Sequence, residues 1–380
     1  MAENKKVDNN KIPDIIIRSP LYRKNLIRYS KFLFFSSLLM WTSVSVCQYS
    51  TAAMIDKIME SYNHAGQPGA SVLVMNHGKV VFKRGYGIAN MNTGEKITSA
   101  TNFRLASITK QFTAMSILIL EERGLLNLND KINKYFPDFP VYGKEISLRN
   151  LLTHSAGLVD YEDLMPATQS TQLHDMDCLQ LMFSTDSLYF PAGTEYKYSN
   201  TGYALLALIV EKVSHQSFAS FLASNIFKPL KMKATVAHEE GKSVVLNRAY
   251  GHSLENGIWK LTDQSLTSAV LGDGGIYSNV EDLSKWIIAL YRHPLIGISK
   301  QKEAFSKATL KNGKQIDYGF GWHVEDYNGV PHPFHDGSSI GFRNSIVLFP
   351  NNELMVVILT NRNEHDPKSE AIKIAELYLK

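Results

Sequence analysis

The feature that most constrains the fold is a pair of strand-rich segments near the two ends of the chain. Near the front, GASVLVMNHGKVVFKRGYGIAN has two runs of β-branched residues on either side of Asn76–His77–Gly78, which predicts a β-hairpin. Near the C-terminus, NSIVLFPNNELMVVILTN predicts a second hairpin about Pro350–Asn351–Asn352. The final segment, DPKSEAIKIAELYLK, predicts a helix that Asp366 caps and Pro367 begins.

Between the two hairpins the apolar residues have helical periodicity. They recur at a spacing near 3.6 in four stretches: Leu148–Leu152, Gly202–Val213, Phe218–Phe227 and Val280–Tyr291. A further short helical pattern, Met54–Ser61, precedes the first hairpin. We therefore predict an α+β fold, with one antiparallel sheet built from N- and C-terminal strands, flanked by helices and carrying an inserted helical lobe. A functional site is expected in the cleft where the lobes meet.

The first 53 residues differ in composition from the rest. Eight of the 40 Lys and Arg residues, but only three of the 36 Asp and Glu residues, lie within residues 1–31. The remainder is nearly neutral, so nucleic acid is not expected as a partner. An uncharged run from Phe32 to Ile55 follows the basic segment. This order is typical of a signal peptide and also of an uncleaved membrane anchor.

A lipoprotein signal at Cys47 is a third alternative, although Val46 stands where a small residue is expected. We predict a targeting segment at 1–53 and a globular domain at 54–380. The domain is expected in the periplasm or another extracytoplasmic compartment, secreted or anchored through residues 32–55. Within it Cys178 is the one cysteine, which excludes an internal disulfide and a cysteine-cluster metal site. No metalloprotease, Walker A or dinucleotide motif occurs, so no metal or organic cofactor is implied.

The segment LASITKQFTAMSILIL, residues 105–120, places Ser107 and Lys110 before a helix that is apolar on nearly every side. Such a helix is expected to be buried. One alternative is that Ser107 only caps the helix and Lys110 extends to the surface; the same spacing recurs at Ser299–Lys302, so the motif alone is not specific. In the catalytic interpretation, the serine faces a helix N-terminus and the buried lysine, with a lowered pKa, accepts its proton.

Tyr198–Ser199–Asn200 precedes another apolar helix, and simple capping is its alternative role. A second copy, Tyr277–Ser278–Asn279, has Glu281 three residues after its serine, which predicts a capping box without chemistry. The first copy has Gly202 at the equivalent position. Its tyrosine is therefore free for another role.

His335–Asp336–Gly337 leads into strand-like sequence, and an ordinary turn is its simplest interpretation. The glycine would also allow a ligand to approach a strand edge closely. Gly337–Gly341 matches the G-x-S-x-G nucleophile elbow of α/β-hydrolases, with Ser339 as the nucleophile. That motif requires a following helix, whereas a strand is predicted here, which disfavours this alternative.

Two further segments are rich in glycine and serine. LLTHSAGL, residues 151–158, predicts a turn after a helix, with His154 as a hydrogen-bonded structural residue. GDGGIYS, residues 272–278, predicts a flexible loop. Neither segment is expected to supply a catalytic group.

Taken in order, three motifs resemble those of the serine β-lactamase and penicillin-binding-protein superfamily: Ser107-x-x-Lys110, Tyr198-x-Asn200 and His335-x-Gly337. The class C-like branch is the most similar; it contains class C β-lactamases, DD-carboxypeptidases, D-aminopeptidases and carboxylesterases. NFRLASITKQFTA, LLTHSAGL, YKYSNTGYALLALIVEKV, GDGGIYSNVEDLSKW and YGFGW also look like that branch. The resemblance runs from about Met54 to the C-terminus and implies a β-lactamase/transpeptidase-like fold.

The resemblance also implies catalytic roles. Ser107 would be the acylated nucleophile and Lys110 its proton acceptor. Tyr198 would carry the proton to the leaving group and from the deacylating water. The oxyanion hole would consist of the backbone N–H groups of Ser107 and Ser338.

The same resemblance assigns substrate binding to Asn200, His335, Gly337 and Ser338. Class C β-lactamases have Lys-Thr-Gly where this chain has His335-Asp336-Gly337, and histidine is typical of DD-peptidase and esterase members. Asp336 is expected to add negative charge beside the site. It would disfavour the carboxylate of a β-lactam or a D-Ala-D-Ala end unless Arg343 compensates.

We therefore expect an exported or membrane-anchored serine hydrolase that forms an acyl-enzyme on an ester or a small peptide, D-amino-acid peptides included. Weak or no β-lactamase activity is predicted. Alternatives are a β-lactamase or penicillin-binding DD-carboxypeptidase, a non-catalytic protein that binds cell-wall peptide, and an α/β-hydrolase acting through Ser339. The expected partner is a small-molecule substrate; the sequence does not specify an oligomeric state.

Overall fold

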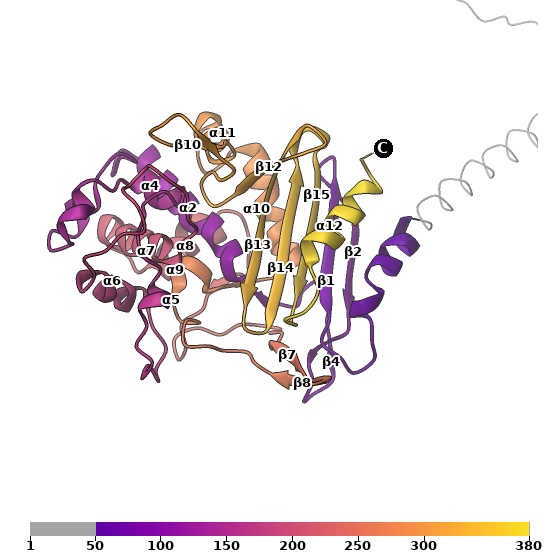
Figure 1. The fold of residues 1–380 in the computed structure, drawn as a ribbon. Helices are drawn as coiled ribbons and strands as arrows, with labels where there is room; N and C mark the ends of the chain where they lie inside the picture. Colours follow the sequence, from indigo (N-terminus) through magenta and orange to yellow (C-terminus); the bar gives the residue numbers. More distant parts are fainter. Residues whose placement is uncertain (1–50, 380) are drawn as a thin grey trace, which may run out of the picture. The chain divides into compact units, whose positions relative to one another are not determined.

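The computed structural model describes residues 51–379 (Figure 1). Almost all of the predicted targeting segment therefore lies outside the described residues. Within residues 51–379, no helix combines the length and apolar character that a membrane span requires. The fold considered below is formed by residues 55–379.

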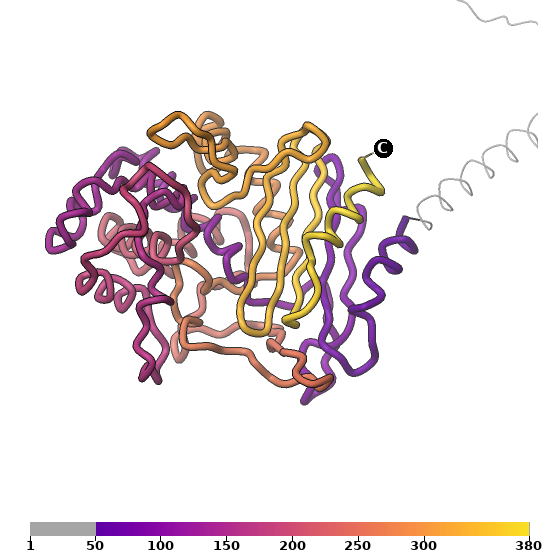
Figure 2. The backbone as a smooth tube through the Cα atoms, viewed as in Figure 1, coloured from indigo at the N-terminus to yellow at the C-terminus, as the bar shows by residue number. Residues whose placement is uncertain are grey.

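The centre of the fold is a six-stranded antiparallel sheet in the order β12-β13-β14-β15-β1-β2. Its strands are β1 (Ala70–Asn76), β2 (Lys79–Tyr86), β12 (His323–Tyr327), β13 (Val330–Ser339), β14 (Phe342–Phe349) and β15 (Leu354–Thr360). Both predicted hairpins are confirmed, and β1 pairs with β15, so the two ends of the chain form one sheet (Figures 1 and 2). Every residue of β15 is buried, as its continuous apolar sequence requires.

A third hairpin, β12–β13, was not predicted from the sequence. Pro331 and Pro333 interrupt β13, and proline removes a backbone donor from a strand. The charged residues of β12 also hide the pattern, since this strand is at the edge of the sheet.

Helices cover both faces of the sheet. The C-terminal helix α12 (Pro367–Glu376) packs on β14 and β15, and α10 (Val280–Arg292) packs behind β1 and β15 (Figure 1). Asp366 caps α12 by accepting from the Lys368 N–H at 3.1 Å, as predicted. The predicted inserted lobe contains α2 (Lys110–Glu122), α4 (Leu148–Leu152), α5 (Tyr161–Leu164), α6 (Asp175–Phe183), α7 (Asn200–Ser214) and α8 (Phe218–Leu222).

Helix α2 is the buried centre of this lobe, since every residue from Lys110 to Leu120 is buried. Two of its polar side chains donate to backbone carbonyls. Thr113 donates to the Gly272 carbonyl at 2.6 Å and Ser116 to the Phe112 carbonyl at 2.8 Å. The prediction of a buried helix is confirmed, and the alternative in which Lys110 extends to the surface is wrong.

The predicted loop at 272–278 is wrong. This segment forms the short helix α9 (Leu271–Gly274) and strand β9 (Ile276–Ser278), which pairs with β5 (Phe103–Arg104) and β6 (Val236–Ala237). The predicted capping box of Ser278 and Glu281 is also wrong. Asn279, not Ser278, caps α10 by accepting from the Asp282 N–H at 2.8 Å, because Ser278 is still part of the strand.

Candidate active site

Ser107 lies in a 3-10 turn (η2, Ala106–Thr109) that runs directly into α2. The turn packs on β13, where a Cβ added to Gly337 would lie 2.1 Å from the carbonyl oxygen of Leu105. Only glycine permits this approach of strand to turn. Ala106 has a φ of 49°, an unusual conformation for a residue with a side chain, directly before the serine.

The Lys110 side chain is completely buried and its ammonium has three acceptors. The Nζ lies 3.1 Å from Ser107 Oγ, 2.8 Å from Asn200 Oδ1 and 3.1 Å from the carbonyl oxygen of Asp273. Burial lowers the pKa of Lys110 to about 8, although the nearby Asp273, Asp160 and Glu162 carboxylates oppose this shift. Roughly a tenth of the lysine is therefore the neutral amine at pH 7, and the fraction rises with pH; a proton acceptor for Ser107 requires this neutral form.

Tyr198 packs against His154, with ring centroids 4.1 Å apart and the rings tilted by 31°, and its ring lies 4.9 Å from Lys110 Nζ. Its hydroxyl is buried and faces Ser107 without forming a hydrogen bond within residues 51–379. Burial raises the pKa of Tyr198 well above its usual value. Tyr198 is therefore a neutral phenol, which can donate a proton, and not a phenolate.

His154 supports this tyrosine. Its Nδ1 accepts from the Ser199 N–H at 3.2 Å, as predicted for a structural histidine. Ser199 does not cap α7; the Asn200 N–H, at the start of the helix, instead donates to Asp160 Oδ2 at 2.6 Å. The capping interpretation of Tyr198–Ser199–Asn200 is therefore wrong.

Asn200 is fixed in orientation by its neighbours. Its Oδ1 accepts from Lys110, and its Nδ2 donates to Glu162 Oε1 at 3.2 Å. Partial desolvation and the Asp160 and Asp273 carboxylates raise the pKa of Glu162 to about 6. Sequence reasoning missed Glu162, because it resembles an ordinary acid in the first turn of a short helix.

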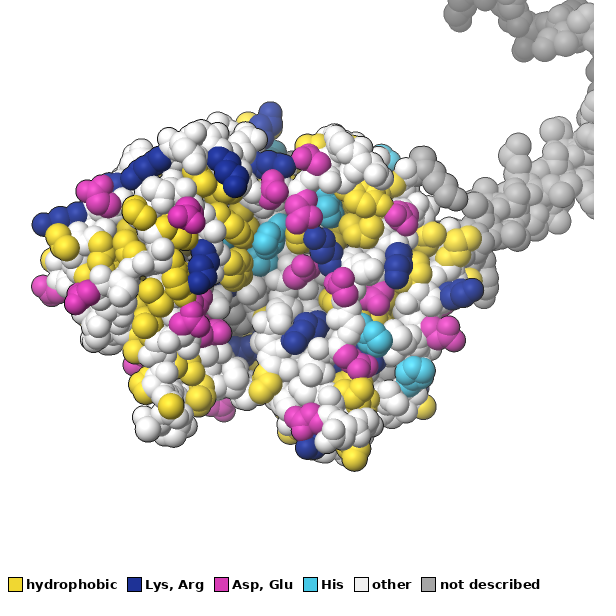
Figure 3. Space-filling model, in the orientation of Figure 1, with side chains coloured by type: hydrophobic (Ala, Val, Ile, Leu, Met, Phe, Trp, Pro, Cys, Tyr) yellow, Lys and Arg dark blue, Asp and Glu magenta, His cyan; other side chains and the backbone are white. Residues whose placement is uncertain are grey.

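A cavity of about 60 Å³ opens beside the nucleophile. Its walls include Ser107, Asn200 and Ser338, which the sequence had assigned to one site, together with Glu162 and Asp273. Figure 3 shows this face of the molecule hollowed between the helical lobe and the sheet, with histidine side chains at the border of the hollow. Lys110, Tyr198 and His335 do not line this cavity.

His335 is buried on β13 and bonds to Tyr318 rather than to Tyr198. Its Nδ1 lies 2.7 Å from the Asp336 carbonyl, which can only accept, so Nδ1 carries the proton and Nε2 accepts from the Tyr318 hydroxyl at 3.0 Å. Burial, together with His323 and Lys110, holds the pKa of His335 well below its usual value. The third motif therefore supplies no positive charge at neutral pH.

The expected charge of Asp336 beside the nucleophile is a wrong expectation. Asp336 is opposite Ser345 in the strand register and accepts from its hydroxyl at 2.7 Å. Because side chains alternate along a strand, this places Asp336 on the face opposite His335. Arg343 donates to the carbonyls of Ser339 and Phe342 and compensates no carboxylate there.

The nucleophile-elbow alternative is also wrong, because Ser339 ends β13 and strand β14 follows it.

Asp273 is a further site residue that sequence reasoning missed, since its segment was predicted to be a loop. Its carbonyl holds Lys110, and its carboxylate accepts from the Tyr161 hydroxyl at 2.8 Å. Asp175 fixes this segment by accepting from the Leu271 and Gly272 N–H groups at 2.9 and 2.8 Å. Across residues 51–379, no group of three His, Cys, Asp or Glu side chains could hold a metal ion.

An antiparallel sheet and a helical lobe, with a Ser-x-x-Lys pair between them, define the class of β-lactamase/transpeptidase-like proteins. Residues 52–379 match the family model Beta-lactamase, so the chain belongs to the β-lactamase family of serine hydrolases. It is 30% identical over 338 residues to penicillin-binding protein 4* of Bacillus subtilis (strain 168), covering 85% of this chain and 74% of that protein.

Two more relatives agree with this family, and a third structure agrees with the fold. Protein flp of Staphylococcus aureus (strain N315) is 29% identical over 325 residues, which are 83% of this chain and 64% of flp, so the chain spans about two thirds of that relative. The penicillin-binding protein of Bacillus halodurans superposes with a TM-score of 0.73 at 26% identity, covering 85% of this chain and 98% of that one. The octameric penicillin-binding protein homologue of Pyrococcus abyssi has the same fold, with a TM-score of 0.73 at 24% identity over 87% of this chain and 77% of its own.

The geometry predicts that Tyr198→Phe lowers kcat for hydrolysis of ethyl acetate by about 10²–10⁴-fold, because the ring packing remains while the donor of the proton that the ethoxide leaving group needs is lost. Steady-state kinetics measure the loss, and circular dichroism reports the fold. Tyr196→Phe, in a neighbouring and exposed ring of the same aromatic cluster, should keep kcat within a few-fold. A Tyr198→Phe enzyme that is equally active would contradict the assigned role.

Proposed function

We propose that this protein is a serine hydrolase that acts through an acyl-enzyme on an ester or a small peptide, D-amino-acid peptides included. The observation that carries the proposal is the 3.1 Å pair of Ser107 Oγ with the buried Lys110 Nζ. Burying a lysine ammonium costs free energy unless the charge is paired, so an unpaired buried lysine is a candidate for a functional group. Here all three acceptors are uncharged, which favours a lysine that gives up its proton.

In the proposed mechanism, neutral Lys110 takes the Ser107 proton as Oγ forms a bond to the substrate carbonyl carbon. The oxyanion is bound by the backbone N–H groups of Ser107 and Ser338, a stabilisation of roughly 3 kcal/mol per donor. The bond to the leaving group then breaks, and Tyr198 gives that group a proton while receiving the one held by Lys110. Water, deprotonated along the same route in reverse, releases the acyl group and restores Ser107.

The charges near Tyr198 favour an uncharged leaving group. His335 and His323 face it, and burial lowers the pKa of His323 to about 4. The lining of an adjacent cavity of about 590 Å³ carries three acids, Glu195, Asp317 and Glu325, and one lysine, Lys314. Two more lysines pair with these acids, Lys307 with Asp317 and Lys368 with Glu325. This cavity therefore has no excess of positive charge for the carboxylate of a leaving group, as in a β-lactam, so we expect weak β-lactamase activity.

A penicillin-binding DD-carboxypeptidase is the second candidate, favoured by the 30% identity to penicillin-binding protein 4*. It would use the same nucleophile and base. A non-catalytic protein that binds cell-wall peptide is disfavoured, since such a protein has no need of a lysine buried against a serine.

The direct test is intact-protein mass of residues 54–380 after treatment with a fluorophosphonate and, separately, with a penicillin. We expect a stoichiometric fluorophosphonate adduct that is lost in Ser107→Ala, with slow or no reaction with penicillin. Ser299→Ala, in the second Ser-x-x-Lys sequence on α11 (Ile298–Ala304), is the matched control and should keep the adduct. Rapid penicillin turnover would favour the second candidate, and no adduct from folded protein would favour the non-catalytic one.

We further propose that residues 1–53 direct the domain across the cytoplasmic membrane, as a signal peptide or as an anchor through residues 32–55. The basic segment followed by the uncharged run supports this proposal. Expression of the full chain in bacteria should place the domain where external protease reaches it. Protection from protease in intact spheroplasts, with cleavage after lysis, would contradict export; the mass of the exported chain distinguishes cleavage from anchoring.

A further inference from the structure

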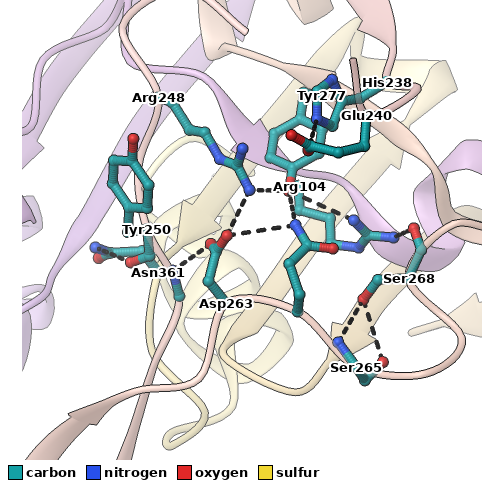
Figure 4. A network of polar contacts seen from close by, with 12 residues as sticks. Arg104, His238, Glu240, Arg248, Tyr250, Asp263, Ser265, Ser268, Tyr277 and Asn361 are labelled. Carbon is teal, nitrogen blue, oxygen red and sulfur yellow. Dashed lines mark hydrogen bonds and ion pairs between the residues drawn. The ribbon is translucent and has the colours of Figure 1, made fainter. Parts of the chain in front are cut away.

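Arg104 places a buried positive charge on the wall of the nucleophile cavity. It ends β5, three residues before Ser107, and its residue is 3% exposed. The guanidinium donates to the Ser268 carbonyl and approaches the Tyr277 hydroxyl at 3.4 Å (Figure 4). Neither acceptor carries a formal charge.

Arg248 contacts the same tyrosine, Tyr277, and provides a comparison, because it is an arginine with an ion-pair partner. It forms an ion pair with Asp263 and also lies 3.1 Å from the Tyr277 hydroxyl (Figure 4). Within residues 51–379 no carboxylate pairs with Arg104 in this way. Asp273 acts on it only through space, and that carboxylate is already held by Tyr161. A buried guanidinium without a directly bonded carboxylate is unusual, since buried charges are normally paired.

The wall around Arg104 is rich in hydroxyl groups, which belong to Ser265, Thr267, Ser268, Ser338 and Ser339. The Ser339 hydroxyl is buried and has no partner in the described part of the chain. Buried hydroxyls normally have one. Arg104 and Ser339 line the same cavity, and a cation with an unsatisfied hydroxyl on one wall is an arrangement that can receive an anion.

The position of Tyr198 indicates which part of the substrate reaches this wall. Tyr198 and Lys110 move the proton of the leaving group, and neither lines the cavity. The leaving group therefore lies on the Tyr198 side of Ser107, and the cavity remains for the acyl group. Its volume of about 60 Å³ suits a small polar group.

We propose that the cavity is an acyl-group subsite for a carboxylate, bound by Arg104 and the Ser339 hydroxyl, so that the preferred substrates carry short acyl groups with an anionic end. This inference rests on the proposed acyl-enzyme function. It assigns a cation without an ion-pair partner to the acyl side, whereas Lys307 and Lys368 on the leaving-group side are paired with Asp317 and Glu325. The carboxylates on the cavity wall, those of Glu162 and Asp273, would instead attract an ammonium group, which the test includes as a rival outcome.

The test compares kcat/KM of the unaltered enzyme for monoethyl succinate and for its isosteric primary amide, ethyl succinamate. We expect at least about a tenfold preference for the carboxylate, which corresponds to 1.4 kcal/mol. The ethyl ester of β-alanine, which ends in an ammonium group, should be the poorest of the three. Arg104→Gln should bring the ratio of succinate to succinamate to one or below, whereas Arg248→Gln, which alters the paired arginine of the same network, should keep it.

Equal rates for the two succinyl esters, or preference for the ammonium ester, would overturn the subsite and leave the proposed function intact. Failure of every ester, with no fluorophosphonate adduct on Ser107, would overturn both. If Arg104→Gln does not fold, Ser339→Ala replaces it, and its ratio of succinate to succinamate should fall at least about threefold. An unchanged ratio in folded Ser339→Ala enzyme would contradict the assignment.

Discussion

The burial of one ammonium group, that of Lys110, is the constraint on which the site depends. Three acceptors must reach it inside a lobe that excludes water, and they come from η2, α7 and the segment of α9. Those elements are held in turn by Asp160, which binds the start of α7, and by Asp175, which binds the start of α9. Loss of any acceptor would leave a donor unsatisfied, which costs about 1–3 kcal/mol.

The groups around Lys110 stabilise its protonated form only weakly. His154 and His335 lie close by with lowered pKa values, so neither adds a competing cation near neutral pH. Tyr318 contributes to this arrangement by donating to His335 Nε2. Gly321, three residues further on, has a φ of 76° and lies where a Cβ would be 2.8 Å from the Lys110 carbonyl. The YGFGW segment thus contacts both the start of α2, through Gly321, and His335, through Tyr318.

The sequence predicted those elements whose formation depends on the residue pattern within a single segment. The two long hairpins and the buried helix after Ser107 follow from alternation and apolar spacing within single segments. Prolines hid β12–β13, and the face on which Asp336 lies depends on strand register, which the segment alone does not reveal. The importance of Arg104 and Glu162 could not be read from the sequence, because a charged side chain becomes informative only when its tertiary neighbours show whether it is paired.

The central claim is that Lys110 is the proton acceptor for Ser107. The most direct measurement is the second-order rate of fluorophosphonate inactivation as a function of pH, with the protein shown to be folded throughout. Neutral Lys110 is the reactive form, so the rate should rise through an apparent pKa of about 8 and level off above it. A rate that is independent of pH between about 6 and 10, or that rises near the usual histidine pKa of about 6.5, would contradict the account.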